Sequence, residues 1–125
     1  MPNFTIAPLP PTRIDEAYPL VRMARPDLTA IGWKAEAQGS LAAGGILALE
    51  APSGVIQALA SWEDRPDCAA LKVDTFVAFE LSRKAPARQA LCEALQALAR
   101  DRGKSAVQFP LGSLGFLGKA PAEAA

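Results

Sequence analysis

Two hydrophobic periods alternate along the chain and predict its strands and helices in order. Residues 3–9 alternate apolar and polar side chains and end among prolines, which is typical of a short strand. Two helices are expected next, over about 13–24 and 25–39. Thr12 is the expected N-cap of the first, and Pro19 is expected to kink or break it. The apolar stripe of the second would contain Leu28, Ile31 and Ala35.

Strand-like runs dominate the middle of the chain. Residues 44–64 hold two apolar runs joined by a Pro-Ser-Gly turn at 52–54, which predicts a β-hairpin, and residues 68–81 supply a third run. The segment 87–102 repeats its apolar residues at the spacing of one helix face. Residues 104–109 then predict a last strand.

The order of these elements is strand, helix, helix, three strands, helix, strand. It predicts an α+β fold with one mixed, mostly antiparallel sheet and helices on both faces. Because a crossover helix precedes the last strand, we expect that strand to be parallel to the one before it. Residues 1–109 would form the domain, and residues 110–125, rich in Gly, Pro and Ala, an irregular tail.

The charge and length of the chain exclude several classes of partner. With 125 residues the chain fits one domain, and its 13 basic and 13 acidic residues give zero formal charge. We therefore expect no nucleic-acid partner and no anionic membrane surface as partner. Neither a targeting signal nor an apolar run of about 20 residues is visible, which predicts a cytoplasmic protein.

The available chemistry is limited by the absence of histidine. Nucleophiles activated by histidine are excluded, and the commonest metal ligand is missing. Cys68 and Cys92 are far apart in sequence, so no metal site is expected and both thiols are expected to be structural. Any reaction must therefore use carboxylates, backbone amides, water or a cosubstrate.

A cluster of cations stands at the start of the 87–102 helix, in SRKAPARQALCEAL (82–95). Positive charge opposes the helix dipole there, so the cluster favours a bound anion, although ordinary solvated surface charges are an equal alternative. With Pro86 as first helical residue, the backbone amides that follow it stay available to an anion. The cations are Arg83, Lys84 and Arg88, and the amides are those of Ala87, Arg88 and Gln89.

Two longer segments resemble a known superfamily. IDEAYPLVRMARPDLT (14–29) is similar to the opening helix pair of small bacterial members of the GCN5-related N-acetyltransferase (GNAT) superfamily. FVAFELSRKAPARQALCEALQALARDRGKSAVQF (76–109) is similar to their central strand, loop, helix and strand. The resemblance covers about residues 3–109 and implies an acyl-CoA-binding protein, with acetyl-CoA as cosubstrate.

The resemblance also implies where the acyl donor binds. The family's loop motif is Arg or Gln, two variable residues, Gly, a variable residue, then Gly or Ala; Arg83 fits it, while Pro86 and Arg88 replace the small residues. The chain is thus a divergent member by this resemblance. The pyrophosphate would lie on the helix start, and the pantetheine arm on backbone between two splayed strands. The implied backbone residues are Phe76, Val77, Ala78 and Phe79.

Acetyl transfer to an amine needs a base, and the family often adds a late tyrosine as acid. The candidate bases are carboxylates at strand ends, of which we prefer Glu63; the others are Asp64, Asp74 and Glu80. No tyrosine follows Tyr18, and only residues 110–125 follow the last predicted strand, where family members continue with a helix and two strands. A C-terminally shortened sheet would expose an edge, which predicts a homodimer.

Two functions are consistent with this pattern. One is an acyl-CoA-dependent N-acyltransferase, in which an unidentified amine attacks acetyl-CoA directly. The other is a catalytically silent GNAT-like module that binds acyl-CoA or a protein partner, including a second copy of itself. A third alternative is an unrelated small α+β domain whose match to the motif is due to chance. Binding of acyl-CoA requires that the strands at 70–81 and 104–109 splay apart.

Overall fold

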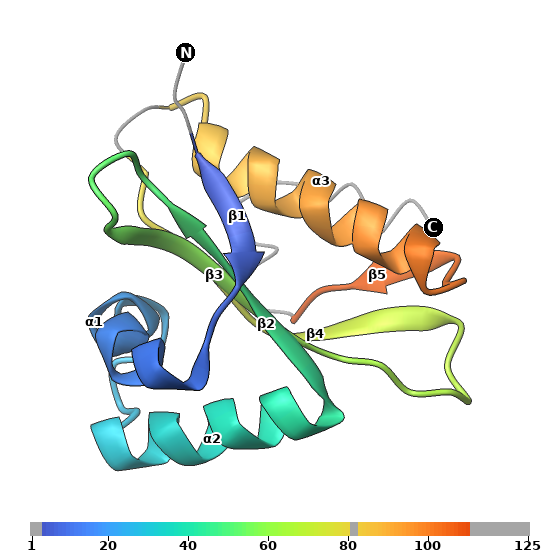
Figure 1. The fold of residues 1–125 in the computed structure, drawn as a ribbon, viewed down its shortest axis with the longest axis horizontal. Helices are drawn as coiled ribbons and strands as arrows, with labels where there is room; N and C mark the ends of the chain where they lie inside the picture. The colour runs from blue at the N-terminus through green and yellow to red at the C-terminus, as the bar shows by residue number, and fades with distance from the viewer. Residues whose placement is uncertain (1–3, 81–82, 111–125) are drawn as a thin grey trace.

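A single mixed sheet forms the centre of the molecule (Figure 1). The computed structural model describes residues 4–80 and 83–110. Five strands lie side by side in chain order; β1 to β4 pair antiparallel, and β5 pairs parallel to β4. The strands are β1 (Thr5–Pro8), β2 (Gly44–Glu50), β3 (Ile56–Glu63), β4 (Ala70–Ala78) and β5 (Ala106–Gln108). This confirms the predicted α+β fold with a mixed, mostly antiparallel sheet.

The helices cover the two faces of this sheet (Figure 1). A 3-10 turn, η1 (Pro11–Arg13), leads into α1 (Ile14–Ala24), which packs with α2 (Ala30–Ala43) on one face. The other face carries α3 (Pro86–Asp101). The three central strands, β2, β3 and β4, contribute to both cores: in β3, Ala58 and Ala60 face α3, whereas Leu59 faces α1 and α2.

The structure corrects the sequence-based account of the first two helices. Thr12 lies inside η1 and caps nothing, so the predicted N-cap is wrong. Thr29 instead caps α2, because its Oγ1 accepts a hydrogen bond of 3.0 Å from the amide of Gly32. The predicted range 25–39 was therefore wrong at both ends.

The buried stripe of α2 also differs from the predicted one. Ile31 is 84% exposed, and the residues that reach the core are Trp33 and Ala37. Trp33 can be buried because its indole N–H donates a hydrogen bond of 2.8 Å to the carbonyl oxygen of Ile14. One long-range bond from an aromatic side chain thus sets which face of the helix turns inward.

Pro19 does not interrupt α1, which runs continuously from Ile14 to Ala24. The missing amide of Pro19 would have bonded the carbonyl of Asp15, and both residues are exposed. Water can hydrate that carbonyl, so the helix tolerates the proline and the expected break is absent. The Pro-Ser-Gly turn, by contrast, is confirmed: Gly54 has a φ of 90°, and the amide of Ala51 donates to the carbonyl oxygen of Val55 at 3.0 Å.

Candidate functional site

The parallel strands β4 and β5 pair over only part of β4. Their register joins Ala70–Lys72 to Ala106–Gln108, while β4 continues to Ala78. Beyond Lys72, no strand formed by residues 4–80 or 83–110 lies beside β4 on that side. Within the described residues, the pairing of the two strands therefore ends at Lys72, well before the end of β4. We call the unpaired side of β4 from Val73 to Ala78 the open edge.

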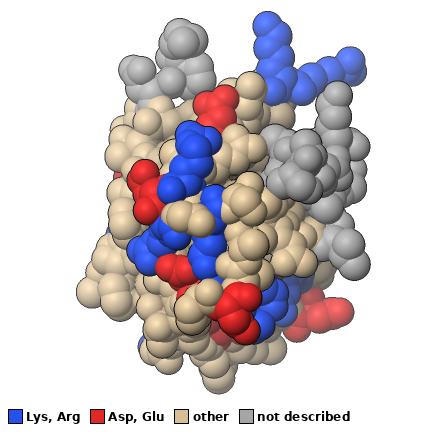
Figure 2. Space-filling view, turned by 90° about the vertical axis from the view of Figure 1, so that its right-hand side faces the viewer, with Lys and Arg blue, Asp and Glu red and all other residues tan. Residues whose placement is uncertain are grey.

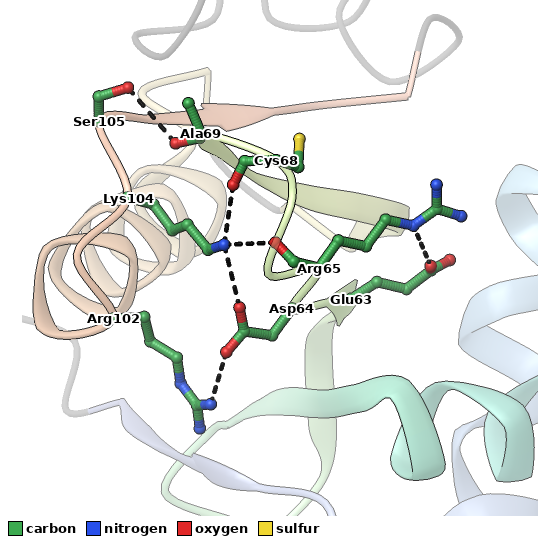
Figure 3. A network of polar contacts seen from close by, with 8 residues as sticks. All are labelled: Glu63, Asp64, Arg65, Cys68, Ala69, Arg102, Lys104 and Ser105. Carbon is green, nitrogen blue, oxygen red and sulfur yellow. Dashed lines mark hydrogen bonds and ion pairs between the residues drawn. The ribbon is translucent and has the colours of Figure 1, made fainter.

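A clamp of charged side chains fixes the paired end of these strands (Figure 3). The Nζ of Lys104 lies 2.6 Å from the carbonyl oxygen of Arg65, 2.8 Å from that of Cys68 and 3.2 Å from Oδ1 of Asp64. Arg102 binds the other oxygen of Asp64 at 2.8 Å. Arg102 and Lys104 both lower the pKa of Asp64, Arg102 more strongly. Asp64 is thus a structural partner and a poor candidate base.

The clamp lies on a face where opposite charges are mixed. Figure 2 shows this side, with basic and acidic side chains interspersed along it. In Figure 1 the same side carries the β3–β4 loop and the end of α3. The mixture agrees with the zero formal charge of the chain and gives no broad basic surface here.

The hydrogen-bond pattern of β4 shows which backbone groups face the open edge. The amide of Phe79 donates to the carbonyl oxygen of Gln57 at 2.8 Å, and the side-chain amide of Gln57 donates back to the carbonyl oxygen of Phe79 at 2.9 Å. Because an antiparallel ladder alternates, Val77 also turns its backbone groups toward β3, and Phe76 and Ala78 turn theirs toward the open edge. Two of the four predicted backbone residues are thus available there.

The open edge leads to the start of α3, where a carboxylate already binds the backbone amides. Pro86 is the first helical residue, as predicted. Oε1 of Glu80 accepts from the amide of Ala87 at 3.3 Å, and Oε2 accepts from the amide of Arg88 at 2.6 Å. The amide of Gln89 donates to the carbonyl oxygen of Ala85 at 3.0 Å. The prediction that these three amides stay available is therefore wrong for Gln89, and the other two bind a carboxylate of the protein itself.

A bulge in β4 places a carboxylate at the beginning of the open edge. Trp62 pairs with Val73 and Ser61 with Thr75, so Asp74 is an extra residue without a partner in the register. The hydroxyl oxygen of Ser61 accepts a hydrogen bond of 3.0 Å from the amide of Thr75, which holds the bulge in shape. Since the pairing of β4 with β5 ends at Lys72, Asp74 lies just beyond the paired part of β4.

Asp74 and Glu63 form a coupled pair with unequal proton affinity. Burial, and then the hydrogen bond to Glu63, raise the pKa of Asp74 to about 6. The hydrogen bond from Asp74, and then that from Arg65 at 3.1 Å, lower the pKa of Glu63. Lys72 lies 3.9 Å from Asp74 and opposes the increase only weakly. Asp74 is therefore the group in this pair that can exchange a proton near neutral pH.

Solved structures share this architecture. An aminoglycoside N-acetyltransferase, AAC(6')-Iy, in complex with CoA superposes with a TM-score of 0.74 at 14% identity, over 98% of this chain and 91% of that one. An aminoglycoside 6'-N-acetyltransferase, AAC(6')-Ih, from Acinetobacter baumannii superposes with a TM-score of 0.75 at 10% identity, over 96% of this chain and 92% of that one. An acetyltransferase from Trypanosoma brucei superposes with a TM-score of 0.69 at 20% identity, over 93% of this chain and 92% of that one. The chain has the GNAT fold.

Sequence comparison does not reach this result. No protein-family model matches the chain, and no curated protein sequence is significantly similar to it. In the described part of this GNAT fold, no helix is long and apolar enough to cross a membrane. Within the same residues, no three Cys, Asp or Glu side chains are grouped so as to hold a metal ion.

The backbone at the start of α3 takes a left-handed conformation at one residue. This residue is Ala85, with a φ of 50°, directly before Pro86. Ala87, which follows the proline, is fully buried. The alignment of Arg83, Pro86 and Arg88 with the GNAT loop motif stays a prediction.

The remaining predicted residues fall into two groups. The side chains of Arg83 and Lys84 are exposed beside the helix start, and their role in binding an anion stays a prediction. Phe76 is buried and packs edge-on against Phe109, with ring centroids 5.3 Å apart, so its side chain belongs to the core. Burial raises the pKa of the Cys92 thiol to about 11, which agrees with a packed thiol and not a nucleophile.

Proposed function

We propose that this protein is an acyl-CoA-dependent N-acyltransferase that transfers the acetyl group of acetyl-CoA to an amine. The observation that carries the proposal is the open edge of β4, which offers backbone groups of Phe76 and Ala78 and ends at the start of α3. An extended pantetheine arm has amides that can pair with such an edge in the manner of an added strand. The AAC(6')-Iy structure, with the same fold, contains CoA.

In the proposed reaction, backbone and side chain have separate tasks. The acetyl thioester supplies an activated carbonyl carbon. Backbone N–H groups at the open edge polarise its oxygen, as donors fixed before the reaction stabilise developing negative charge. The amine nitrogen forms a bond to the carbonyl carbon, the carbon–sulfur bond breaks, and coenzyme A leaves as a thiolate that solvent can protonate.

Asp74 is the residue that we assign as base. Its carboxylate accepts the proton that the amine must lose, directly or through one water molecule. A pKa of about 6 suits this task, because the group is mostly ionised at pH 7 yet still holds a proton well enough to remove one. Glu63, preferred from sequence, has its pKa lowered by Asp74 and Arg65 and is a weaker base. In this proposal it supports the proton affinity of Asp74.

The proposal is tested first by thermal unfolding with and without acetyl-CoA. Ligand at about 100 times its dissociation constant stabilises a folded protein by about 2.7 kcal/mol, which raises Tm. If Tm does not increase at millimolar acetyl-CoA, the proposal is wrong. If Tm rises, release of free thiol in the presence of a panel of primary amines measures transfer.

A second function is supported by the contact of Glu80 with the helix amides. A protein whose anion site is already filled could bind acyl-CoA weakly and never turn it over. This catalytically silent module, with a homodimer as its expected form, would show stabilisation by acetyl-CoA but no thiol release with any amine. Sedimentation equilibrium of the full chain then reports whether it dimerises.

A further inference from the structure

We infer that Glu80 is an internal competitor of the acyl donor. Its carboxylate occupies the amides of Ala87 and Arg88 in the free protein and must leave them before a pyrophosphate can bind there. The inference rests on the proposed function, because it concerns the control of that same site. It assigns Glu80 a part that the sequence did not suggest, where this residue was only one of four candidate bases.

The geometry of the contact is that of a bound anion. One carboxylate oxygen accepts from each amide, at 3.3 Å and 2.6 Å, so both oxygens of Glu80 are engaged. Amides in the first turn of a helix are the groups that bind phosphate oxygens in many proteins, because they lack partners inside the helix. Glu80 thus presents to α3 the same chemical feature, a pair of negatively charged oxygens, that a phosphate would present.

The helix start has no further amide to offer a second anion. Pro86 has no N–H, and the amide of Gln89 is used within the helix by the carbonyl oxygen of Ala85. From Pro86 to Gln89, every backbone donor is therefore absent or already bonded. A pyrophosphate that binds the amides of Ala87 and Arg88 must therefore replace the carboxylate of Glu80.

The position of Glu80 makes this competition strong. Glu80 follows Phe79, whose amide and carbonyl oxygen are both bonded to Gln57, at 2.8 Å and 2.9 Å. The end of β4 is thus held in place. The carboxylate of Glu80 is therefore kept close to the amides of Ala87 and Arg88, which gives it a high effective concentration there. A pyrophosphate carries more negative charge than one carboxylate, and Arg83 and Lys84 stand nearby, so it can still displace Glu80.

A binding experiment on full-length variants tests the inference. Glu80→Gln keeps the size of the side chain and removes its charge, so we expect coenzyme A to bind about tenfold more tightly than to the natural protein, by isothermal titration calorimetry. Pantetheine, which lacks the pyrophosphate, should bind both proteins equally. Glu93→Gln is the matched control: it removes the same charge from an exposed position further along α3 and should leave both affinities unchanged.

Each outcome decides between the inference and the proposed function. If the natural protein binds coenzyme A and Glu80→Gln binds it no more tightly, Glu80 is only a helix cap and the inference is wrong, while the proposed function stands. If neither protein binds coenzyme A or pantetheine at millimolar concentration, the proposed function fails together with the inference.

A second measurement needs no variant and guards against misfolding of Glu80→Gln. In the natural protein, the NMR signal of the Arg88 amide should shift on addition of coenzyme A and stay in place on addition of pantetheine. A shift with both ligands, or with neither although coenzyme A binds, would contradict displacement of Glu80 by the pyrophosphate.

Discussion

The two ends of β4 differ in how their backbone is satisfied. At the paired end, β5 lies alongside Ala70–Lys72, and the ammonium of Lys104 binds two carbonyl oxygens of the β3–β4 loop and Asp64. At the other end, from Val73 to Ala78, β4 pairs with β3 on one side, and none of the described residues forms a strand on its other side. Among the described residues, β4 is thus paired on both sides over its first part and on one side over the rest.

This difference shows that a candidate binding site can form where the pairing of two strands ends. Three pairs of residues join β4 to β5, and the clamp holds them at their outer end. The bulge at Asp74 then begins the open edge, and Glu80 closes it against α3. Fixing the strands firmly at one end lets them remain apart at the other without loss of register.

The largest expected effect comes from the residue between the two ends. Asp74→Asn should lower kcat by about a thousandfold, because it removes the proposed base while keeping the shape of the side chain. In the natural protein, kcat should rise with pH through about 6, as Asp74 loses its proton. Measurements of kcat from pH 5 to 8 check the loss in Asp74→Asn and the pH dependence of the natural protein. Glu63→Gln is the matched variant, because it removes the other carboxylate of the pair. An equal loss in Glu63→Gln, with Asp74→Asn active, would reverse the assignment.

The next effect concerns the paired end alone. Lys104→Met should lower the free energy of unfolding by about 2–3 kcal/mol, because the Lys104 side chain is 8% exposed, and its loss leaves two carbonyl oxygens without their donor and removes one of the two cations that bind Asp64. Urea denaturation measures the change. Lys34→Met, at an exposed position on α2, should stay within about 0.5 kcal/mol of the natural protein. Similar values for both variants would show that the clamp contributes nothing.

A smaller effect sharpens the description of the open end. Ala85→Gly should raise the free energy of unfolding by about 1 kcal/mol, because glycine adopts the left-handed conformation at this position without steric cost. Ala97→Gly places the same substitution at an exposed site inside α3 and should lower stability by about 0.5–1 kcal/mol. Urea denaturation of the two variants should thus give opposite signs. The same sign in both would contradict the strain at Ala85.

A last expected effect is a dependence of stability on pH. The pKa of Asp74 is about 6 in the folded protein and about 3.9 in an unfolded chain, so the folded state holds more protons between these values. The contribution of Asp74 to the free energy of unfolding therefore falls as pH rises from about 4 to about 6. Asp74→Asn should remove this decrease and run parallel to the natural protein above pH 7. Urea unfolding curves at a series of pH values measure the free energy of unfolding as a function of pH. If its slope between pH 4 and 6 is the same in Asp74→Asn, the raised pKa of Asp74 is wrong.

The order of elements could be predicted from sequence because it depends on local patterns. The three strands in the middle and the helix starting at Pro86 follow from the period of their apolar residues. The start of α2 could not be found in this way, since Pro26 and Asp27 imitate a helix start that Thr29 actually provides. Local patterns therefore predict whether a segment is a helix or a strand better than they predict its first and last residues.

The candidate site was harder to predict because contacts distant in sequence define it. The binding of Glu80 to the amide of Arg88 and of Lys104 to Asp64 depends on how the sheet and α3 are packed. The raised pKa of Asp74 depends on a bulge that shifts its register against Trp62 and Ser61. The position of carboxylates on or near strand ends was the local signal, and it placed Asp74 among the candidates without ranking it first.

The buried ammonium of Lys104 has a consequence for chemical labelling. A lysine held by three oxygen atoms and 8% exposed is shielded from acylating reagents, including reactive thioesters, whereas Lys34 lies open to them. Lys104 would become acylated only in molecules whose paired end had come apart. Mass spectrometry of the labelled chain could therefore record, through one side chain, how often β4 and β5 separate completely.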